Sequence, residues 1–161
     1  LWVARGVLLG SVILHIAAAF RLYAKNNAAR PQRYQKKRDV ATNYAARTMM
    51  ISGPLLIGFI VYHLAHLTLG VSPSAFEHSD TDVYSNVVHG FSVPWVAGLY
   101  IVSMLALGNH LFHGTWSMFQ TLGWNHTAYN QRLMRVALGI TLFVTLGNIS
   151  IPLAVLVGIV R

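Results

Sequence analysis

The sequence predicts an all-α, up-and-down bundle of transmembrane helices, and three observations support this prediction. Of the 161 residues, 55% are hydrophobic and only 10% are charged, whereas a water-soluble domain carries about 25% charged residues. The mean hydropathy is positive, at +0.51. Four stretches reach the length of about 20 apolar residues that a helix needs to cross the hydrocarbon core, and they are 2–23, 48–70, 93–119 and 133–160. We therefore expect the whole chain, 1–161, to form one membrane domain.

The expected spans carry anchoring residues near their ends. Span 2–23 has Arg5 near one end and Arg21 near the other, where long basic side chains can extend to the interface. Arg135 lies just inside span 133–160. Bulky aromatic residues are typical of both membrane interfaces, and those near the expected span ends are Trp2, Tyr23, Trp95, Trp116 and Trp124.

The connections between the spans predict the orientation of the chain. Connection 24–47 holds seven basic residues and a single acid, Asp39, whereas connection 71–92 holds three acids and no Lys or Arg. Connection 120–132 contains Arg132. Because cytoplasmic loops are enriched in Lys and Arg, we expect 24–47 and 120–132 to be cytoplasmic and 71–92 to lie outside. The basic connection is either a topology signal alone or also a docking surface.

Composition excludes several kinds of site. The chain has no cysteine, which excludes disulfides, thiolate-ligated zinc and iron–sulfur clusters, the Rieske type included. The formal net charge is +8, but in a membrane protein the distribution of basic residues matters more than their sum. We therefore expect contact with membrane lipid and no nucleic acid partner.

Histidines are the main functional signal, because ionisable groups inside a membrane are costly and are usually functional. Five of the eight lie within or at the ends of spans: His15, His63, His66, His110 and His113. The alternative for any one of them is a neutral imidazole bonded to a carbonyl of a neighbouring helix. At 1.5 Å per residue, His15 and His110 lie about 12 and 13 Å from the cytoplasmic face. Matching depths would let these two imidazoles hold one haem iron from opposite sides, as suits electron transfer.

His63 lies at a different level, about 10 Å from the outer face, and is expected to belong to a second, outer haem. His66 and His113 follow His63 and His110 by one helical turn, on about the same face, which leaves the choice within each pair open. We favour His63 and His110 as the iron ligands. His66 and His113 are then expected to bond to haem propionates or to a quinone.

A quinone pocket is expected at the cytoplasmic end, because a quinone head group needs a few convergent polar groups in an apolar pocket. The residues expected to contact the quinone or a haem propionate are Arg21, Arg47, Ser52, His66, His113 and Trp116. For Arg47 and Trp116, interfacial anchoring is the alternative. A further quinone site at the outer face, near Glu77 or His78, has less support.

Several motifs form a distinctive pattern: AKNNAAR at 24–30, RTMMISG at 47–53, VYHL at 61–64, NHLFHGTWS at 109–117 and TLGW at 121–124. Over essentially the whole chain, this pattern resembles the single-chain, di-haem cytochrome b subunit that anchors bacterial succinate dehydrogenases and fumarate reductases. The resemblance implies five spans, with histidine ligands on the first four. This sequence aligns with the second to fifth spans.

The resemblance assigns the ligands in order. His15, His63 and His110 match the ligands of the second, third and fourth spans, and the second and fourth share the haem nearer the iron–sulfur subunit. The partner of His63 belongs to the first span. Since the sequence begins within an apolar run, we expect a further N-terminal helix to supply that histidine. His89 is expected to be too shallow for this role.

The resemblance also implies a function. Electrons would pass through two b haems between the iron–sulfur and flavoprotein subunits and a membrane quinone, menaquinone or ubiquinone, in the bacterial cytoplasmic membrane. Succinate chemistry would occur in the partner chains. The alternatives are the cytochrome b subunit of another quinone-linked oxidoreductase, and a haem-free anchor or transport bundle whose histidines relay protons or bridge helices.

Overall fold

The computed structural model describes residues 1–29, 44–71 and 78–161, and these ranges form helices and no strand. The helices are α1 (Trp2–Ala28), α2 (Tyr44–Leu67), α3 (Val83–Phe91), α4 (Pro94–Thr121) and α5 (Asn130–Leu156). Helices α1, α2, α4 and α5 are long and apolar enough to cross a membrane. The predicted transmembrane helical bundle is confirmed, and the chain is a multi-pass membrane protein.

Two helices end earlier than the expected spans. Helix α2 ends at Leu67 instead of reaching Gly70, and α5 ends at Leu156 instead of Val160. Gly70 has a φ of 68° and Gly158 a φ of 74°, a left-handed conformation that commonly ends a helix and favours glycine. Apolar composition continues beyond both ends, so hydropathy alone placed them too late. The other helix ends lie within a few residues of the expected spans or run beyond them.

The chain divides into two compact units, Leu1–Val40 and Ala41–Arg161, and each is described by itself. In the first unit, α1 has no buried residue, and the Arg5 guanidinium carbon lies 5.2 Å from the centre of the Trp2 ring. A helix that is apolar on all sides requires lipid or other helices around it.

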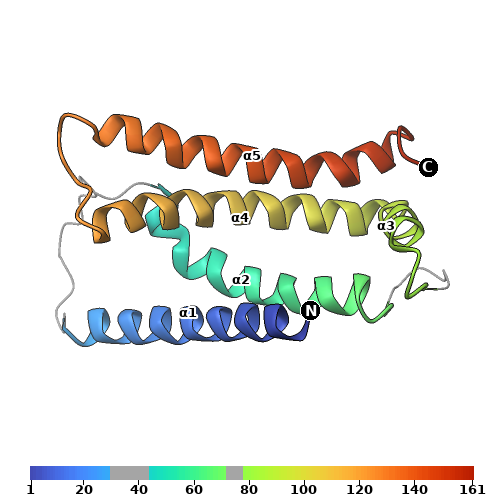
Figure 1. The fold of residues 1–161 in the computed structure, drawn as a ribbon, viewed down its shortest axis with the longest axis horizontal. Coiled ribbons are helices and arrows are strands. Elements are labelled where there is room, and N and C mark those ends of the chain that lie inside the picture. The colour runs from blue at the N-terminus through green and yellow to red at the C-terminus, as the bar shows by residue number, and fades with distance from the viewer. Residues whose placement is uncertain (30–43, 72–77) are drawn as a thin grey trace. The chain divides into compact units, whose positions relative to one another are not determined.

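In the second unit, α4 is the central helix and packs against α2 on one side and α5 on the other (Figure 1). Gly108 allows the close approach of α4 and α5, because a Cβ at this position would lie only 2.6 Å from Thr145 Oγ1. Small residues have this role at many membrane helix interfaces. Helix α2 bends in its first half (Figure 1), where Pro54 removes a main-chain donor and favours a kink.

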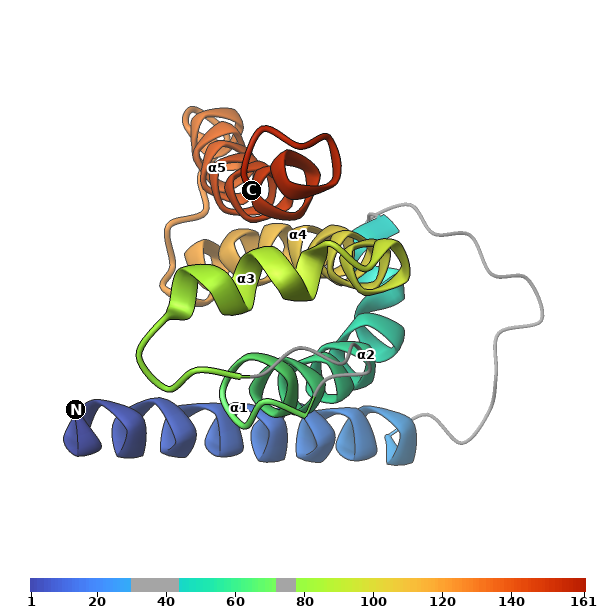
Figure 2. The same ribbon diagram turned by 90° about the vertical axis from the view of Figure 1, so that its right-hand side faces the viewer.

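The expected outer loop, 71–92, contains an unexpected helix. Asp82 caps the start of α3, because its carboxylate accepts hydrogen bonds from the backbone N–H and the hydroxyl of Ser85, at 3.0 and 2.6 Å. The Asn86 side chain exchanges two hydrogen bonds with the backbone of Ser79. Helix α3 runs across the end of α4 and α5 instead of along them (Figures 1 and 2). This short helix therefore closes one end of the second unit.

Candidate functional site

Helices α2 and α4 meet along a seam that carries three hydrogen-bonded pairs. These pairs are Thr48–Asn109, Ser52–His110 and His66–Tyr100. Polar side chains often join helices in this way inside membranes, where a polar group without a partner is costly. The pairs place histidine side chains at two levels of the seam, which we call the Ser52 end and the Tyr100 end.

The Ser52 end consists of Thr48, Ser52, Asn109 and His110. Asn109 Nδ2 donates to Thr48 Oγ1 over 2.6 Å, and Ser52 Oγ lies 3.2 Å from His110 Nδ1. Ser52 is only 5% exposed, so the contact is shielded from water by protein. Next to it, Gly53 faces the same ring, since a Cβ there would lie 3.9 Å from His110 Cε1. The ring of His110 is therefore held from the α2 side through Nδ1.

The Tyr100 end consists of Phe59, His63, His66 and Tyr100. His66 is completely buried, and its Nδ1 lies 3.0 Å from the Tyr100 hydroxyl. Its Nε2 is also buried and has no hydrogen-bond partner among the described residues. That nitrogen faces α3, where a Cβ at Gly90 would lie only 2.9 Å away. His66 is thus enclosed by protein on every side.

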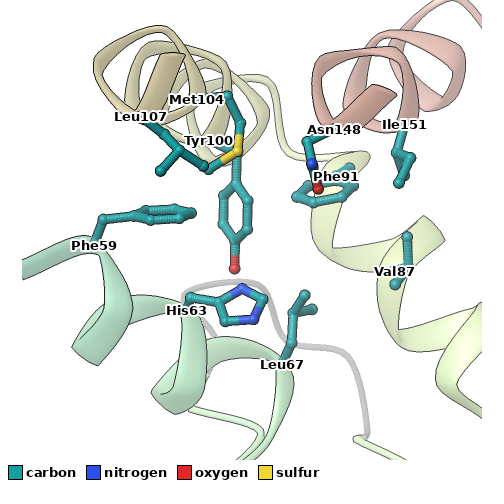
Figure 3. Close-up of a pocket in the computed structure, with 10 residues that line it drawn as sticks. All are labelled: Phe59, His63, Leu67, Val87, Phe91, Tyr100, Met104, Leu107, Asn148 and Ile151. Carbon is teal, nitrogen blue, oxygen red and sulfur yellow. The ribbon is translucent and has the colours of Figure 1, made fainter. Parts of the chain in front are cut away.

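His63 has different surroundings, although it lies only one turn from His66. It lines a cavity of about 320 Å³ between α2, α3, α4 and α5 (Figure 3). Its ring centre lies 5.9 Å from the ring centres of both Phe59 and Tyr100. The lining residues are Phe59, His63, Leu67, Val87, Phe91, Tyr100, Met104, Leu107, Asn148 and Ile151. The walls are therefore mostly apolar and aromatic, with three polar side chains among them.

The two ends are separated along the membrane-spanning direction of α2. Ser52, which contacts His110, precedes His63 by eleven residues, which corresponds to about 16 Å of helix. His63 and His110 therefore belong to two different levels of the second unit. The described residues contain no group of three or more His, Cys, Asp or Glu side chains that could hold a metal ion. An axial imidazole on a haem needs no such cluster.

Other predicted site residues lie near the Ser52 end. His113 Nε2 lies 3.1 Å from the hydroxyl of Ser117 on the same helix, while its buried Nδ1 has no hydrogen-bond partner in the described part of the chain. Trp116 is half-buried, and Arg47 is exposed in the first turn of α2. Among the residues expected to contact the quinone, Ser52 contacts a predicted haem ligand, His110.

The remaining predicted residues belong to other segments of the chain. His15 and Arg21 belong to α1 in the first unit, so the pairing of His15 with His110 stays a prediction. His78 Nε2 lies 4.0 Å from Asp80 Oδ1. Glu77 and most of the basic connection lie outside the described residues.

Two side chains in the cavity were missed by the reasoning from sequence. Tyr100 supplies both a cavity wall and the hydroxyl that contacts His66. Asn148 lines the cavity from α5, and its Nδ2 donates to the carbonyl of Val144 over 2.8 Å. A polar side chain in the middle of an apolar span was the available signal in both cases.

Comparisons with known proteins are consistent with this arrangement. A family model described as succinate dehydrogenase/fumarate reductase transmembrane subunit matches residues 21–146. No curated protein and no solved structure matches the chain. The match covers well over half of the sequence, including α2, α3 and α4 in full. The chain belongs to the family of transmembrane subunits of succinate dehydrogenase and fumarate reductase.

Proposed function

We propose that this chain relays electrons between the iron–sulfur subunit of its complex and a membrane quinone, through b haems held by its own histidines. The observation that carries the proposal is the position of His63, whose imidazole lines an apolar cavity inside a membrane protein. The family supports partner subunits of this kind. Succinate or fumarate chemistry belongs to the flavoprotein subunit, and this chain serves as anchor and electron path.

The lining of the cavity at the Tyr100 end suits an apolar or aromatic guest. Its volume of about 320 Å³ is at the lower end of the range of about 300–1,000 Å³ typical of ligand pockets. Phe59 and Phe91 supply aromatic walls, and His63 supplies an imidazole that can act as an axial ligand. A haem, when bound, supplies reversible one-electron chemistry at its iron. The opposite ligand for this haem is proposed to come from another histidine of the intact complex, as in the family pattern.

The haem nearer the iron–sulfur subunit is proposed to be held by His15 and His110. His110 lies at the Ser52 end, where its ring is oriented from α2. Matching depths in their helices, about 12 and 13 Å from one face, support this pairing. Arg21 is proposed to neutralise a haem propionate near the same face.

The quinone is proposed to bind beyond the Ser52 end, close to this haem and to the iron–sulfur subunit. His113 offers a buried Nδ1 that no described residue satisfies, and the half-buried Trp116 follows one turn later. Arg47 would place a positive charge beside a quinone oxygen. A mostly apolar pocket with a few such donors is what a quinone head group requires.

The orientation follows from the charges at the two ends of the second unit. Arg47, Arg132 and Arg135 lie at the Ser52 end, whereas Asp80, Asp82 and one basic residue, Arg161, lie at the end closed by α3. The positive-inside rule then assigns the Ser52 end to the cytoplasm. In a bacterium this places the iron–sulfur and flavoprotein subunits on the inner side of the cytoplasmic membrane.

The test is the visible spectrum of the purified, dithionite-reduced complex. The wild-type complex should show b-type bands, and His15→Ala and His110→Ala should each remove the contribution of one haem. His126→Ala is the control, because His126 is exposed in the connection between α4 and α5. Unchanged haem content in both ligand variants would refute the pairing. A wild-type complex without b-type bands would indicate that the chain is a haem-free anchor. Copurification of a different set of subunits would indicate that the chain belongs to another quinone-linked oxidoreductase.

A further inference from the structure

Ser52 has two hydrogen-bond contacts that together restrict the ring of His110. Its Oγ lies 3.4 Å from the carbonyl oxygen of Met49, one turn earlier on α2, and 3.2 Å from His110 Nδ1 on α4. A serine hydroxyl has one proton to donate and two lone pairs to accept with. Bonding of a helical serine to the carbonyl of a preceding turn is common. When the hydroxyl donates to Met49, only its lone pairs remain to face His110.

With the Ser52 hydroxyl donating to Met49, this arrangement favours one tautomer of the imidazole. A lone pair on Ser52 Oγ is satisfied by a proton on His110 Nδ1, and a neutral imidazole carries only one proton. The other nitrogen, Nε2, is then the basic one and the one able to ligate a metal. In metal sites, the second nitrogen of a ligating histidine almost always donates to such a partner, which fixes the orientation of the ring and raises its basicity.

We propose that Ser52 is a positioning residue for His110. The Ser52 hydroxyl stabilises the tautomer of His110 with a proton on Nδ1, so that Nε2 is the nitrogen available to the haem iron. The inference rests on the proposed function, because it requires His110 to be an iron ligand. It assigns to Ser52 a role different from that of a quinone contact. The hydroxyl influences the midpoint potential of the haem through the imidazole of His110, and it does not contact the quinone.

The surroundings make this contact effective. Ser52 is 5% exposed, so little water competes for His110 Nδ1, and hydrogen bonds are electrostatically stronger in such a medium. One turn earlier on α2, Thr48 accepts a 2.6 Å hydrogen bond from Asn109, the residue directly before His110. This second bridge holds α2 against α4 without touching the imidazole. It therefore provides a matched control within the same interface.

The experiment measures the midpoint potential of the cytoplasmic-side haem, together with the low-spin electron paramagnetic resonance signal, in the intact complex. Ser52→Ala removes the acceptor and makes the imidazole less basic, so the ferric state is stabilised less and the potential should rise. Ser52→Thr keeps the hydroxyl and should restore the wild-type potential. Thr48→Ala removes the neighbouring bridge and should leave the potential unchanged.

Each other outcome has a defined meaning. Loss of the haem in Ser52→Ala with retention in Ser52→Thr supports the inference, whereas loss in both contradicts it, because the hydroxyl should rescue the site. An unchanged potential in Ser52→Ala with a raised KM for the quinone overturns the inference and returns Ser52 to the quinone pocket. Full haem content in His110→Ala would instead refute the proposed assignment of His110 as an iron ligand, on which this inference rests.

Discussion

The two ends of the α2–α4 seam hold their histidines in different ways. At the Ser52 end, a short hydroxyl side chain meets the ring of His110 across the seam. At the Tyr100 end, His66 is enclosed and bonded to Tyr100, while His63, one turn earlier, lines the cavity. Spacing in the sequence cannot separate two histidines on about the same helix face. Burial and hydrogen-bond partners distinguish them: His66 joins α2 to α4, and His63 can contact a ligand in the cavity.

Alanine substitutions at the Tyr100 end test this comparison most strongly. His63→Ala should remove one haem from the complex, because loss of an axial imidazole leaves the iron five-coordinate or the site empty. His66→Ala should retain that haem in the low-spin state and lower thermal stability instead, because the Tyr100 hydroxyl loses its partner. The measurements are haem-to-protein stoichiometry, the reduced spectrum and the unfolding temperature. If His66→Ala lost the haem and His63→Ala retained it, His66 would be the iron ligand and His63 would not.

Glycine substitutions compare the packing around the histidines at the two ends. At Gly90, a new Cβ would lie 2.8 Å from His66 Cε1, whereas at Gly53 it would lie 3.9 Å from His110 Cε1. Gly90→Ala should therefore destabilise the protein by about 1–3 kcal/mol, the usual cost of overpacking. Gly53→Ala should be neutral or stabilise by up to about 1 kcal/mol, because alanine favours a helix. Thermal unfolding in the same detergent measures both variants.

A double substitution shows whether the collision with His66 is the cause. In a His66→Ala background, Gly90→Ala should cost much less, because the imidazole that it meets is gone. Gly98→Ala is a second control, since a Cβ at that helical position would have no neighbour within 4 Å. Equal destabilisation by Gly90→Ala with and without His66 would show that α3 does not pack as described.

The smallest expected effect concerns α3, which closes the Tyr100 end. The hydroxyl and the backbone N–H of Ser85 donate to Asp82 and hold the pKa of its carboxyl below the ordinary value of 3.8. Because the pKa is lowered in the folded state, the cap contributes its full stabilising free energy above the ordinary pKa. This stabilisation is lost as the pH falls below that value. Amide hydrogen exchange in α3 should therefore accelerate only below about pH 4 relative to α4. Asp82→Asn keeps an acceptor that does not titrate and should remove this pH dependence.

The helices that cross the membrane were predictable, and α3 was not. Four long apolar stretches predict four spans because the hydrocarbon core sets a minimum length. Helix α3 has only nine residues and contains both polar and apolar side chains, so a search for long apolar stretches could not detect it. Its local signals were Asp82 at the start and, after Phe91, the proline at position 94, which begins α4.

The levels of the candidate site residues were predictable from the sequence, but their contacts were not. Depth along each helix follows from the rise per residue, and this singled out His63 and His110 as belonging to different levels. Which side chains meet across the seam depends on the rotation of α2 and α4 about their axes, and on the bend near Pro54. Neither is encoded in spacing along one helix. For this reason neither the contact of Ser52 with His110 nor that of the Tyr100 hydroxyl with His66 was predicted.

The three bridges between α2 and α4 also bear on how the protein is assembled in the cell. All of them join neutral groups, and interhelical hydrogen bonds in membranes average about 0.6 kcal/mol each, so together they supply only about 2 kcal/mol. A ligand that binds only to the paired helices stabilises the pair by about 2.7 kcal/mol when its free concentration is a hundredfold above its Kd. The hydrogen bonds alone therefore leave the pairing of these helices dependent on side-chain packing and on any bound ligand. On the proposed function, the supply of haem would then determine, by mass action, how much of the chain reaches its final state.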